Sequence, residues 1–353
     1  MMKPYRVGII GLGRVAWLIE RDPLRAKPCS HVGAWLARDD VALVAACDVD
    51  AERLAQFGNA FSVNALYTDY RAMLANESLD FVSICAYATE RCLMVIAAAE
   101  SGVKGIWCEK AAATSLQEMD QMAQALRTYG TQMIVSYMRR WENRYRVVRG
   151  YIAAGGIGRL QTINVHFTGN MLHTGTHAFD LLRMFAGEAV TVQAWLTEDN
   201  GRPVQSGYRY EGDEVDEDYG GNAVIHFDSD IIATIHGETK DYFRFELELL
   251  GSHGMVRIGN TQSENWIVGD STYSAGLLEL QRGEFPAFQE NNIWIDAAAD
   301  LVRSCESGGE VACDVVDARA ALAIALAMHV SHRRGHQVVD PRGISTEMAV
   351  RSR

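Results

Sequence analysis

The stretch VGIIGLGRVA, Val7–Ala16, places a glycine-rich turn between an apolar run and an amphipathic segment. Its glycines have the spacing G-x-x-G-x-G and are Gly8, Gly11 and Gly13. Tyr5–Ile10 has the pattern of a buried strand and Arg14–Glu20 that of the start of a helix, which is the context such a motif requires. Glycines let the backbone turn tightly beside a pyrophosphate, and the first N–H groups of the helix, at Arg14 and Val15, face the anion. The stretch therefore predicts a dinucleotide-binding turn.

A second apolar run, Val41–Cys47, ends in Asp48. A Rossmann fold places an acid here to accept hydrogen bonds from the adenosine ribose. Because its carboxylate would repel a 2′-phosphate, we expect NAD rather than NADP. The interval from Gly13 exceeds the usual ~20 residues, since Arg21–Ser30 has the pattern of an inserted loop before a second helical segment at His31–Ala37. An aspartate at a strand end is also a common turn or helix cap, and this alternative stays open.

The composition is that of an ordinary globular protein: 353 residues, 48% hydrophobic and 22% charged, long enough for two domains. The formal net charge of −12 disfavours nucleic acid and anionic membranes as partners, because Lys and Arg hold both. The acidic stretch EGDEVDED, Glu211–Asp218, has no apolar periodicity. It is expected to be a solvated loop rather than a metal site.

The sequence also predicts where the protein resides. No run approaches the ~18 to 20 uncharged residues that span a bilayer, and the longest apolar helix, near Ala320–Val330, carries His329. The N-terminus lacks a basic segment followed by an apolar core. The seven cysteines form no C-x-x-C pair, and their odd number fits reduced thiols better than a disulfide or zinc framework. We therefore expect a cytoplasmic protein without a membrane partner.

Apolar strands alternate with helices from the N-terminus to about Tyr137. After the first two strands, further strands are expected at Ala65–Tyr67, Asp80–Ala86, Gly105–Glu109 and Gln132–Tyr137. Helices are expected at Asp50–Phe57, Asp69–Ala75 and Glu90–Ser101, and from Thr114 or Ser115 to Tyr129. Continuous apolar strands alternating with helices are typical of a parallel sheet covered on both faces. The pattern predicts a doubly wound α/β domain.

The second half has a different pattern. After a helix at about Trp141–Ala153, the segment Leu160–Gly169 alternates polar and apolar residues as a half-buried strand does. Further strands are expected at Asn222–Phe227, Ile231–Gly237, Phe243–Leu250 and Gly254–Ile258. Short turns such as Asp228–Asp230 separate them, and strands joined so closely must pair antiparallel. Helices at about Glu290–Ser304 and Val315–Arg333 close the chain.

Three motifs resemble those of the Gfo/Idh/MocA family of NAD(P)-dependent dehydrogenases: GIIGLGRVA at Gly8–Ala16, CEKA at Cys108–Ala111, and HTGTHAFDLL at His173–Leu182. The resemblance covers nearly the whole chain. It implies a Rossmann domain with a doubly wound parallel sheet over residues 1–137, and an α+β domain with an open, mostly antiparallel sheet over residues 138–353. In the family the second domain supplies the substrate pocket and often the oligomer interface. A small polyol or sugar substrate and a homodimer or homotetramer are therefore implied.

The resemblance also assigns roles to particular residues. In the family a Glu-Lys-Pro motif ends the fifth strand, and its lysine reaches the substrate hydroxyl beside the nicotinamide. Glu109 and Lys110 match this motif, with Ala111 in place of proline. A second signature is an aspartate followed four residues later by the catalytic histidine. His177 matches that histidine, and His173 replaces the aspartate.

The chemistry of these side chains supports the assignment. Moving a hydride from an alcohol carbon to a nicotinamide requires the hydroxyl proton to leave and the developing alkoxide to be stabilised. Lys110 is expected to orient the hydroxyl and polarise its oxygen, and His177 to act as base in oxidation and acid in reduction. Four residues apart on one helix, His173 and His177 project from the same face and can address one small polyol.

Three further residues are weaker candidates. Asp180, one turn beyond the second histidine, is expected to bind substrate or the imidazole, or alternatively to pair with Arg183 on the helix surface. Tyr87 leaves the fourth strand at the sheet edge where cofactors lie and is expected to contact the dinucleotide. Arg139, followed by Arg140 after the sixth strand, is expected to hold substrate or cofactor, or else to be solvated.

The favoured function is an NAD-dependent oxidoreductase that interconverts a secondary hydroxyl and a ketone on a sugar, sugar derivative or cyclitol. One alternative is an NAD-binding sensor without turnover, because Ala111, Met138 and His173 depart from the family signatures. Another is a zinc hydrolase using His173 and His177, but a third ligand is not evident and no metal is expected. A third variant is an enzyme that keeps NAD bound and recycles it within each turnover.

Overall fold

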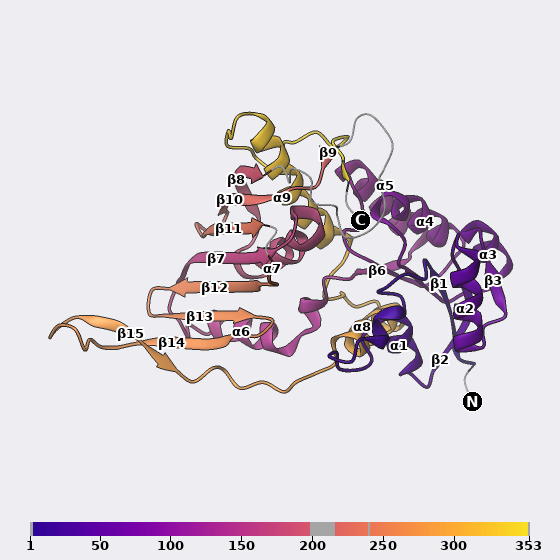
Figure 1. Ribbon diagram of the computed structural model, residues 1–353, viewed down its shortest axis with the longest axis horizontal. Helices are drawn as coiled ribbons and strands as arrows, with labels where there is room; N and C mark the ends of the chain where they lie inside the picture. The colour runs from indigo at the N-terminus through magenta and orange to yellow at the C-terminus, as the bar shows by residue number, and fades with distance from the viewer. Residues whose placement is uncertain (1–2, 198–215, 239–240, 352–353) are drawn as a thin grey trace. The chain divides into compact units, whose positions relative to one another are not determined.

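A computed structural model describes residues 3–197, 216–238 and 241–351, which form two compact units (Figure 1). The first unit contains the residues up to Glu142 together with Asn291–Arg319, and the second contains Asn143–Glu290 and Ala320–Arg351. The sequence placed a single boundary after Tyr137. The return of Asn291–Arg319 to the first unit is a long-range packing choice that local patterns do not reveal.

The first unit is built on a six-stranded parallel sheet with the order β3-β2-β1-β4-β5-β6. Its strands are β1 Tyr5–Ile10, β2 Val41–Cys47, β3 Ala65–Tyr67, β4 Phe81–Ile84, β5 Gly105–Cys108 and β6 Gln132–Val135. Its α-helices are α1 His31–Leu36, α2 Ala51–Phe61, α3 Tyr70–Asn76, α4 Ala88–Glu100, α5 Leu116–Tyr129 and α8 Ile293–Ser307, and α9 Val315–Arg333 begins here. The predicted doubly wound sheet is confirmed. The strand order reverses between β1 and β4, where such folds bind ligands.

Side-chain caps explain why several of these helices begin where they do. Asp50 accepts the N–H groups of Glu52 and Arg53 at the start of α2. Ser115 and Glu118 form a reciprocal capping box at the start of α5. Such caps satisfy N–H groups that have no partner inside the helix. The sequence predicts these helix starts because the capping residue types stand directly before segments with apolar periodicity.

The helix expected at Arg14–Glu20 is wrong. A turn follows the glycines, and only the short 3₁₀ helix η1, Leu18–Arg21, lies before α1. The N–H groups of the first two residues of α1 donate to the carbonyls of Val15 and Ala16, at 3.2 and 3.0 Å. Helix α1 therefore continues the turn that begins after Gly13, and the intervening residues are inserted between the two parts.

The second unit contains an eight-stranded sheet with the order β15-β14-β13-β12-β7-β11-β10-β8. Its strands are β7 Leu160–Thr168, β8 Ala189–Thr197, β10 Gly220–Phe227, β11 Ile232–Glu238, β12 Phe245–Gly251, β13 Gly254–Gly259, β14 Ser263–Asp270 and β15 Leu278–Gly283. All pairs are antiparallel except β7 with β11, which confirms a mostly antiparallel sheet. The sequence missed β8, β14 and β15. Most residues of β15 are exposed, so no buried face marks that strand.

The helical elements of the second unit are α6 Asn143–Ala153, the π-helical turn η3 Met171–Gly175, α7 Thr176–Ala186 and the rest of α9. Among the described residues, α9 is the one helix long and apolar enough to cross a membrane. Of its apolar 18-residue stretch, 67% is buried inside the protein. That degree of burial is typical of a core helix.

The acidic stretch expected to be a solvated loop is only partly described. Glu211–Val215 lie outside the described residues. Asp216–Glu217 form the short strand β9, which pairs in parallel with β16, Val350–Arg351. Asp218, the last residue of the stretch, has a side chain that is only 6% exposed. The expectation of a solvated loop is therefore wrong for Asp218, whose carboxylate has internal partners.

Candidate active site

Several predicted site residues of the first unit lie where the parallel strands end. The N–H of Gly11, after β1, donates to Cys47 of β2 at 2.8 Å. The N–H of Glu109, after β5, donates to Ile84 of β4 at 2.9 Å. These bonds continue the strand ladder past the sheet edge. The glycine turn, Asp48 and Lys110 therefore follow strands β1, β2 and β5 at the same carboxyl edge of the sheet, where open α/β sheets bind ligands.

The three glycines of the motif differ in how much space a Cβ atom would have at each position. Gly11 has φ +83°, and a Cβ there would lie 2.6 Å from the Ala86 nitrogen, so the turn packs against the backbone after β4. A Cβ at Gly13 would meet nothing within 4 Å, which leaves open space beside the turn. Gly8 is within β1, where a Cβ would lie 2.7 Å from Leu79. Arg14 is exposed and Val15 is half-buried.

Asp48 is buried at the end of β2 and joins the glycine turn to the next loop. Its Oδ2 accepts the N–H of Leu12 at 2.6 Å, and its Oδ1 accepts the N–H of Asp50 at 2.9 Å. Arg53 Nη1 lies 3.5 Å from Oδ2. The turn-capping role that the sequence left open is therefore real. Each carboxylate oxygen has two lone pairs, so the same group retains capacity for a ribose hydroxyl.

Glu109, next to Lys110, lies in a buried group of polar side chains that we call the Glu109 cluster: His31, Ser83, Arg91 and Glu109. His31 Nε2 is 3.0 Å from Glu109 Oε1, and the N–H of Lys110 donates to Glu109 Oε2 at 3.2 Å. Burial opposes ionisation of Glu109, but the hydrogen bond from His31 and the charges of His31, Arg91 and Lys110 outweigh it. The pKa of Glu109 falls to about 2.

Arg91, on α4, connects the loops that follow β4 and β5. Its Nε donates to the Ala86 carbonyl at 2.9 Å, and its Nη1 donates to the Ala111 carbonyl. The bond between Lys110 and Ala111 is a cis peptide bond. Sequence reasoning missed Arg91, His31 and Ser83. The available signal was a polar residue inside an apolar segment, such as the serine of DFVSICA.

The expectation that His173 and His177 share one α-helix is wrong. His173 lies in the π-helical turn η3 and is exposed, whereas α7 begins at Thr176 and carries His177, which is half-buried. Gly175 N–H donates to Asn170, five residues earlier, at 3.0 Å. The same-face argument was based on α-helical spacing and does not apply across this turn.

Asp180 is fully buried on α7, so it is not the surface residue that one alternative assumed. Arg183, its expected surface partner, pairs with Glu188 at 2.6 Å. A buried carboxylate requires internal partners. Burial therefore places Asp180 among the internal polar groups of the second unit.

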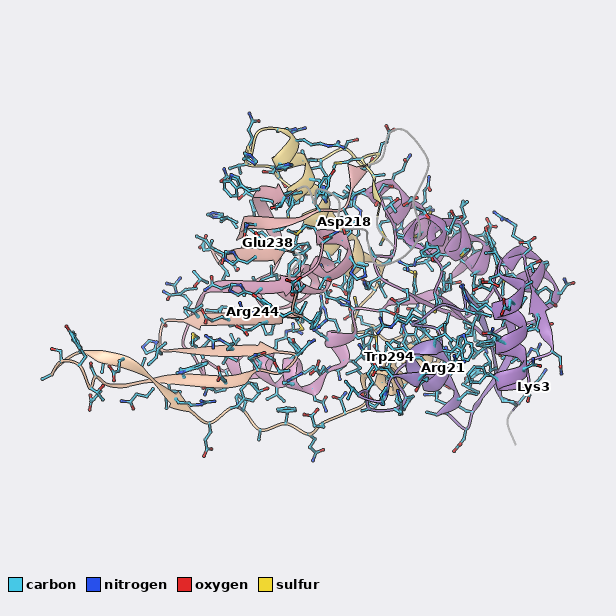
Figure 2. The ribbon with its side chains drawn as sticks, viewed as in Figure 1. Lys3, Arg21, Asp218, Glu238, Arg244 and Trp294 are labelled. Carbon is cyan, nitrogen blue, oxygen red and sulfur yellow. The ribbon has the colours of Figure 1, made fainter. Side chains whose placement is uncertain are left out.

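Asp218, which is labelled in Figure 2, holds the start of η3. Its carboxylate accepts the N–H groups of Leu172, at 2.9 and 3.0 Å, and of His173, at 3.0 Å. His329 Nε2, on α9, lies 3.6 Å from the same carboxylate. Negative charge at exposed N–H groups stabilises a helix start. Sequence reasoning missed this residue because an acidic run resembles a solvated surface.

The other candidates of the first unit follow strand ends. Tyr87 precedes α4 and is 38% exposed. Arg139 and Arg140 lie in the 3₁₀ helix η2, Met138–Trp141, after β6. Arg140 Nη2 is 3.6 Å from Asp317 Oδ1, and both side chains are largely buried. Arg140 therefore has a structural partner, and Arg139 is half-buried beside it.

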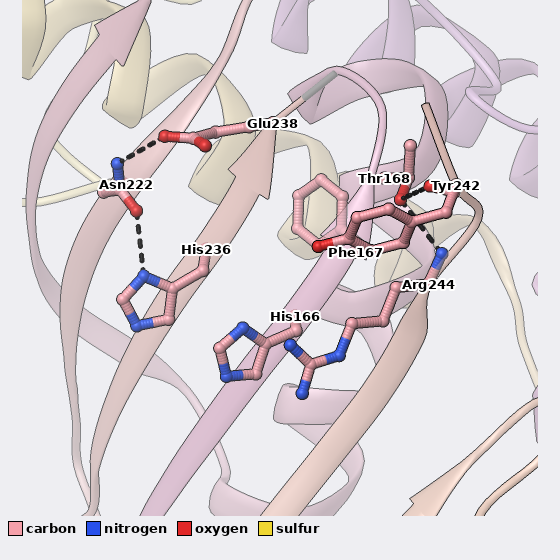
Figure 3. Close-up of a pocket in the computed structure, with 8 residues that line it drawn as sticks. All are labelled: His166, Phe167, Thr168, Asn222, His236, Glu238, Tyr242 and Arg244. Carbon is pink, nitrogen blue, oxygen red and sulfur yellow. Dashed lines mark hydrogen bonds between the residues drawn. The ribbon is translucent and has the colours of Figure 1, made fainter. Parts of the chain in front are cut away.

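A pocket on the polar face of the eight-stranded sheet is lined by residues that differ from the predicted site residues (Figure 3). The rings of His166 and His236 stack there with centroids 4.8 Å apart. Asn222 links His236 Nδ1, at 2.8 Å, to Glu238, at 3.1 Å. Burial and the positive charge of Arg244 lower the pKa of His166. The neutral form of this imidazole is therefore favoured.

Thiol and metal chemistry receive little support from the described residues. All seven cysteines are free, and burial raises the pKa of Cys108, at the end of β5, to about 12. A thiol with so high a pKa is a poor nucleophile. Within the described ranges, no group of three or more His, Cys, Asp or Glu residues is arranged to hold a metal ion.

Comparison with known proteins identifies both halves of the chain. Residues 5–137 match the oxidoreductase family with an NAD-binding Rossmann fold, and residues 168–257 match the GFO/IDH/MocA C-terminal domain. A D-apiose dehydrogenase from Paraburkholderia graminis is 37% identical over 129 residues, which are 36% of this chain and 34% of that protein. Inositol 2-dehydrogenase 3 from Saccharopolyspora erythraea is 24% identical over 311 residues, 83% of this chain and 85% of that protein.

A solved structure extends the likeness to the whole fold. The myo-inositol 2-dehydrogenase from Lactobacillus plantarum superposes with a TM-score of 0.73 at 26% identity, covering 96% of this chain and 99% of that one. The two domain matches occur in the order of the two units. The chain belongs to the GFO/IDH/MocA family of oxidoreductases with an NAD-binding Rossmann fold.

Proposed function

We propose that this protein is an NAD-dependent oxidoreductase that interconverts a secondary hydroxyl and a ketone on a sugar, sugar derivative or cyclitol. The observation that carries the proposal is the meeting of the glycine turn, Asp48 and the Glu109–Lys110 segment at one sheet edge. The similarity to dehydrogenases named for apiose and inositol supports the substrate class.

The residues at this edge fit a dinucleotide. Gly11 lets the turn approach the neighbouring backbone, and the space beside Gly13 accepts a pyrophosphate next to backbone N–H groups. We assign Asp48 to the hydroxyls of the adenosine ribose, a contact that favours NAD over NADP. When bound, NAD supplies the acceptor for the hydride.

We assign the remaining chemistry to the protein's own side chains. We assign Lys110 to hold the substrate hydroxyl and to stabilise negative charge that develops on its oxygen. We assign His177 to accept the hydroxyl proton in oxidation and return it in reduction. His173, at the exposed turn before α7, is assigned to substrate hydrogen bonding, and Asp180 and Arg139 are secondary candidates for the same task.

The decisive test is nicotinamide reduction with a panel of cyclitols, sugars and anhydrosugars, comparing NAD with NADP. Lys110→Met is expected to lower kcat by roughly 10³-fold, because a preorganised charge facing the alkoxide is lost. Lys104→Met is the matched control, since Lys104 pairs with Asp80 at 2.8 Å and is half exposed. Turnover by Lys110→Met at the rate of the control would contradict the proposed role.

The panel also separates the competing functions. NAD binding without turnover of any panel member, and without a retained cofactor, would favour the NAD-binding sensor. Cofactor that remains through dialysis would favour an enzyme that recycles bound NAD. We further propose that the protein is cytoplasmic, in agreement with its free cysteines. We also propose a homodimer or homotetramer, and light scattering of the purified protein checks its mass.

A further inference from the structure

We propose that His31 is a positioning residue for Lys110 and acts through the carboxylate of Glu109. The inference rests on the proposed function, in which Lys110 contacts the substrate hydroxyl. His31 comes from the helix that follows the insertion, whereas Glu109 and Lys110 follow β5. The imidazole therefore connects the inserted segment to the lysine through contacts within the first unit.

A continuous chain of hydrogen bonds runs through the unit to Lys110. The Trp35 indole N–H donates to Ser83 Oγ at 2.9 Å, and His31 Nδ1 lies 3.1 Å from the same oxygen. His31 Nε2 then meets Glu109 Oε1 at 3.0 Å, while Glu109 Oε2 accepts the N–H of Lys110 at 3.2 Å. His31 and Ser83 are 0% exposed. Water therefore cannot replace the hydrogen bonds that His31 and Ser83 make.

The hydrogen-bond partners also decide which way His31 Nε2 acts toward Glu109. Ser83 Oγ accepts the indole N–H and has one proton of its own to donate. Because the carboxylate of Glu109 can only accept a hydrogen bond at this contact, His31 Nε2 donates to it. This arrangement satisfies every donor and acceptor in the buried chain. It makes His31 the donor that holds one oxygen of Glu109, while the other oxygen holds Lys110.

Aromatic packing fixes the orientation of the His31 ring. The ring lies against Trp107, with centroids 4.1 Å apart, and meets Trp294 edge-on at 5.6 Å. Helix α1 is itself held at its start, where Ser30 Oγ accepts the N–H of Gly33 at 3.0 Å. Glu20 Oε1, in η1, in turn accepts the hydroxyl of Ser30, the last residue of the insertion, at 2.7 Å. The insertion thus determines where His31 stands.

Loss of the donor would free the carboxylate that orients the lysine backbone. Glu109 would then have one buried oxygen without its hydrogen-bond donor, and a buried anion moves to restore such a contact. Because Glu109 Oε2 also holds the Lys110 N–H, this movement would shift the lysine. Catalytic rates are sensitive to displacements of about 1 Å, which cost up to 10²-fold.

The kinetic test compares His31→Leu, which removes the donor, with His31→Gln, whose amide N–H₂ can replace it. We expect kcat to fall roughly tenfold in His31→Leu and about twofold in His31→Gln. KM for NAD is expected to stay within about twofold of wild type, because the glycine turn and Asp48 are untouched. Thr131→Val is the matched control, since it removes one buried hydrogen bond, to Val103 at 3.0 Å, away from the cluster.

A second measurement needs no substrate or cofactor. The chain has five lysines, so ¹⁵N-lysine labelling yields few backbone signals; they are Lys3, Lys27, Lys104, Lys110 and Lys240. The Lys110 signal is assigned by its loss in Lys110→Arg. We expect faster solvent exchange and a changed shift for the Lys110 amide in His31→Leu and Glu109→Gln, but not in Thr131→Val. If His31→Leu does not fold, Ser83→Ala serves in its place and moves the same signal less.

The two arms separate failure of the inference from failure of the proposed function. Wild type that turns over no panel substrate would overturn the proposed function, while the amide signal still decides whether His31 positions Lys110. An unchanged Lys110 signal in folded His31→Leu would overturn the inference. So would equal loss of kcat in His31→Leu and His31→Gln, because the hydrogen bond would then not be what matters.

Discussion

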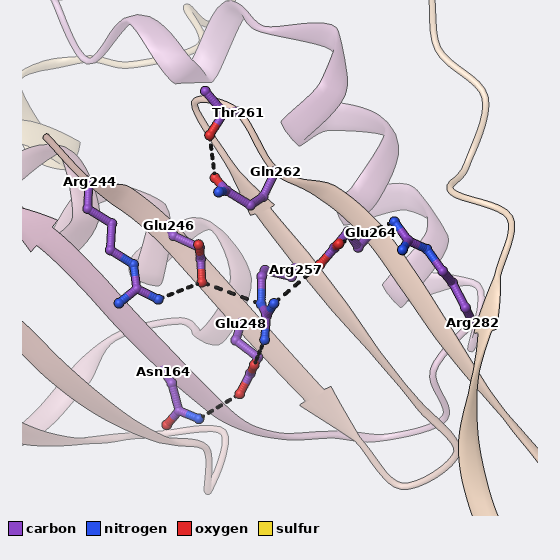
Figure 4. Close-up of polar contacts among 9 residues, drawn as sticks. All are labelled: Asn164, Arg244, Glu246, Glu248, Arg257, Thr261, Gln262, Glu264 and Arg282. Atoms are coloured by element: carbon purple, nitrogen blue, oxygen red, sulfur yellow. Dashed lines mark hydrogen bonds and ion pairs between the residues drawn. The ribbon is translucent and has the colours of Figure 1, made fainter.

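The Glu109 cluster and a set of ion pairs on the eight-stranded sheet use similar residue types in opposite surroundings. In the cluster, Glu109 is 5% exposed and its partners are buried. On the sheet, Arg257 is 34% exposed and lies 2.9 to 3.4 Å from three glutamates (Figure 4). We call this second set the Arg257 ladder, and it comprises Arg244, Glu246, Glu248, Arg257, Glu264 and Arg282.

The difference shows that burial decides what a charged contact contributes. Burial opposes ionisation of Glu248 in the ladder, but hydrogen bonds from Arg257 and Asn164 outweigh it and lower its pKa. At Glu109 solvent is nearly absent, so burial opposes ionisation more strongly. The hydrogen bond from His31 and the nearby charges, which favour ionisation, are also stronger there. Around Arg257, water and salt screen the pairs. Removing the buried Arg91 from the cluster should therefore be costly, and removing the more exposed Arg257 from the ladder nearly neutral.

The largest effect is expected from Arg91→Met. The substitution removes the donor to the Ala86 and Ala111 carbonyls and the cation beside Glu109. We expect the free energy of unfolding to fall by about 3 to 5 kcal/mol, as when one partner of a buried charge pair is lost. Urea denaturation measures it. The control is Arg319→Met, whose partner Asp120 is half exposed, and an equal loss there would contradict the role of burial.

Glu109→Gln tests the same cluster through pH. The folded pKa of Glu109 is lowered from 4.5 to about 2, so its ionisation stabilises the fold above about pH 4.5 and this stabilisation is lost as pH falls toward 2. The shift corresponds to a contribution on the order of 3 kcal/mol at neutral pH. The stability difference between wild type and Glu109→Gln should be constant from pH 7 to 5 and then shrink. Urea midpoints at each pH check this, and a constant difference down to pH 3 would contradict it.

Asp218→Ala extends the comparison to a buried carboxylate in the second unit. It removes the acceptor of the Leu172 and His173 N–H groups, which lie at the start of η3. A lost helix cap costs about 0.5 to 2 kcal/mol, and we expect the upper end because the site is buried. Thermal unfolding measures the loss. Faster amide exchange at Leu172 and His173 than in Asp230→Ala, a turn control, would place the effect at η3.

The smallest effect is expected from Arg257→Met. Glu248 and Glu264 remain partly exposed, and the buried Glu246 keeps Arg244 at 2.9 Å, so the loss should be below about 1 kcal/mol. The loss should also shrink in 1 M salt, which screens exposed pairs. Denaturation at low and high salt measures both. A loss comparable to that of Arg91→Met would remove the distinction between the two sets.

Much of the secondary structure of the first unit could be predicted from the sequence because it depends on local residue patterns. Strands β1, β2 and β3 begin and end where their apolar runs predict, and Asp50 and Ser115 mark helix starts. The glycine turn could also be predicted, because the positive φ and close backbone approach at Gly11 require a glycine there. These features depend on residues that are close together in the sequence, so local sequence patterns are enough to predict them.

The sequence by itself determined the two sheet types, the turn at Gly11 and the candidate residues Asp48, Glu109, Lys110 and His177. Tertiary structure alone decided that Asp218, within an acidic run, is a buried cap, and that His31, 78 residues before Glu109, is its partner. It also returned Asn291–Arg319 to the first unit. The physical reason is that burial and long-range hydrogen bonds depend on which surfaces meet, and a local pattern of residue types does not contain that information.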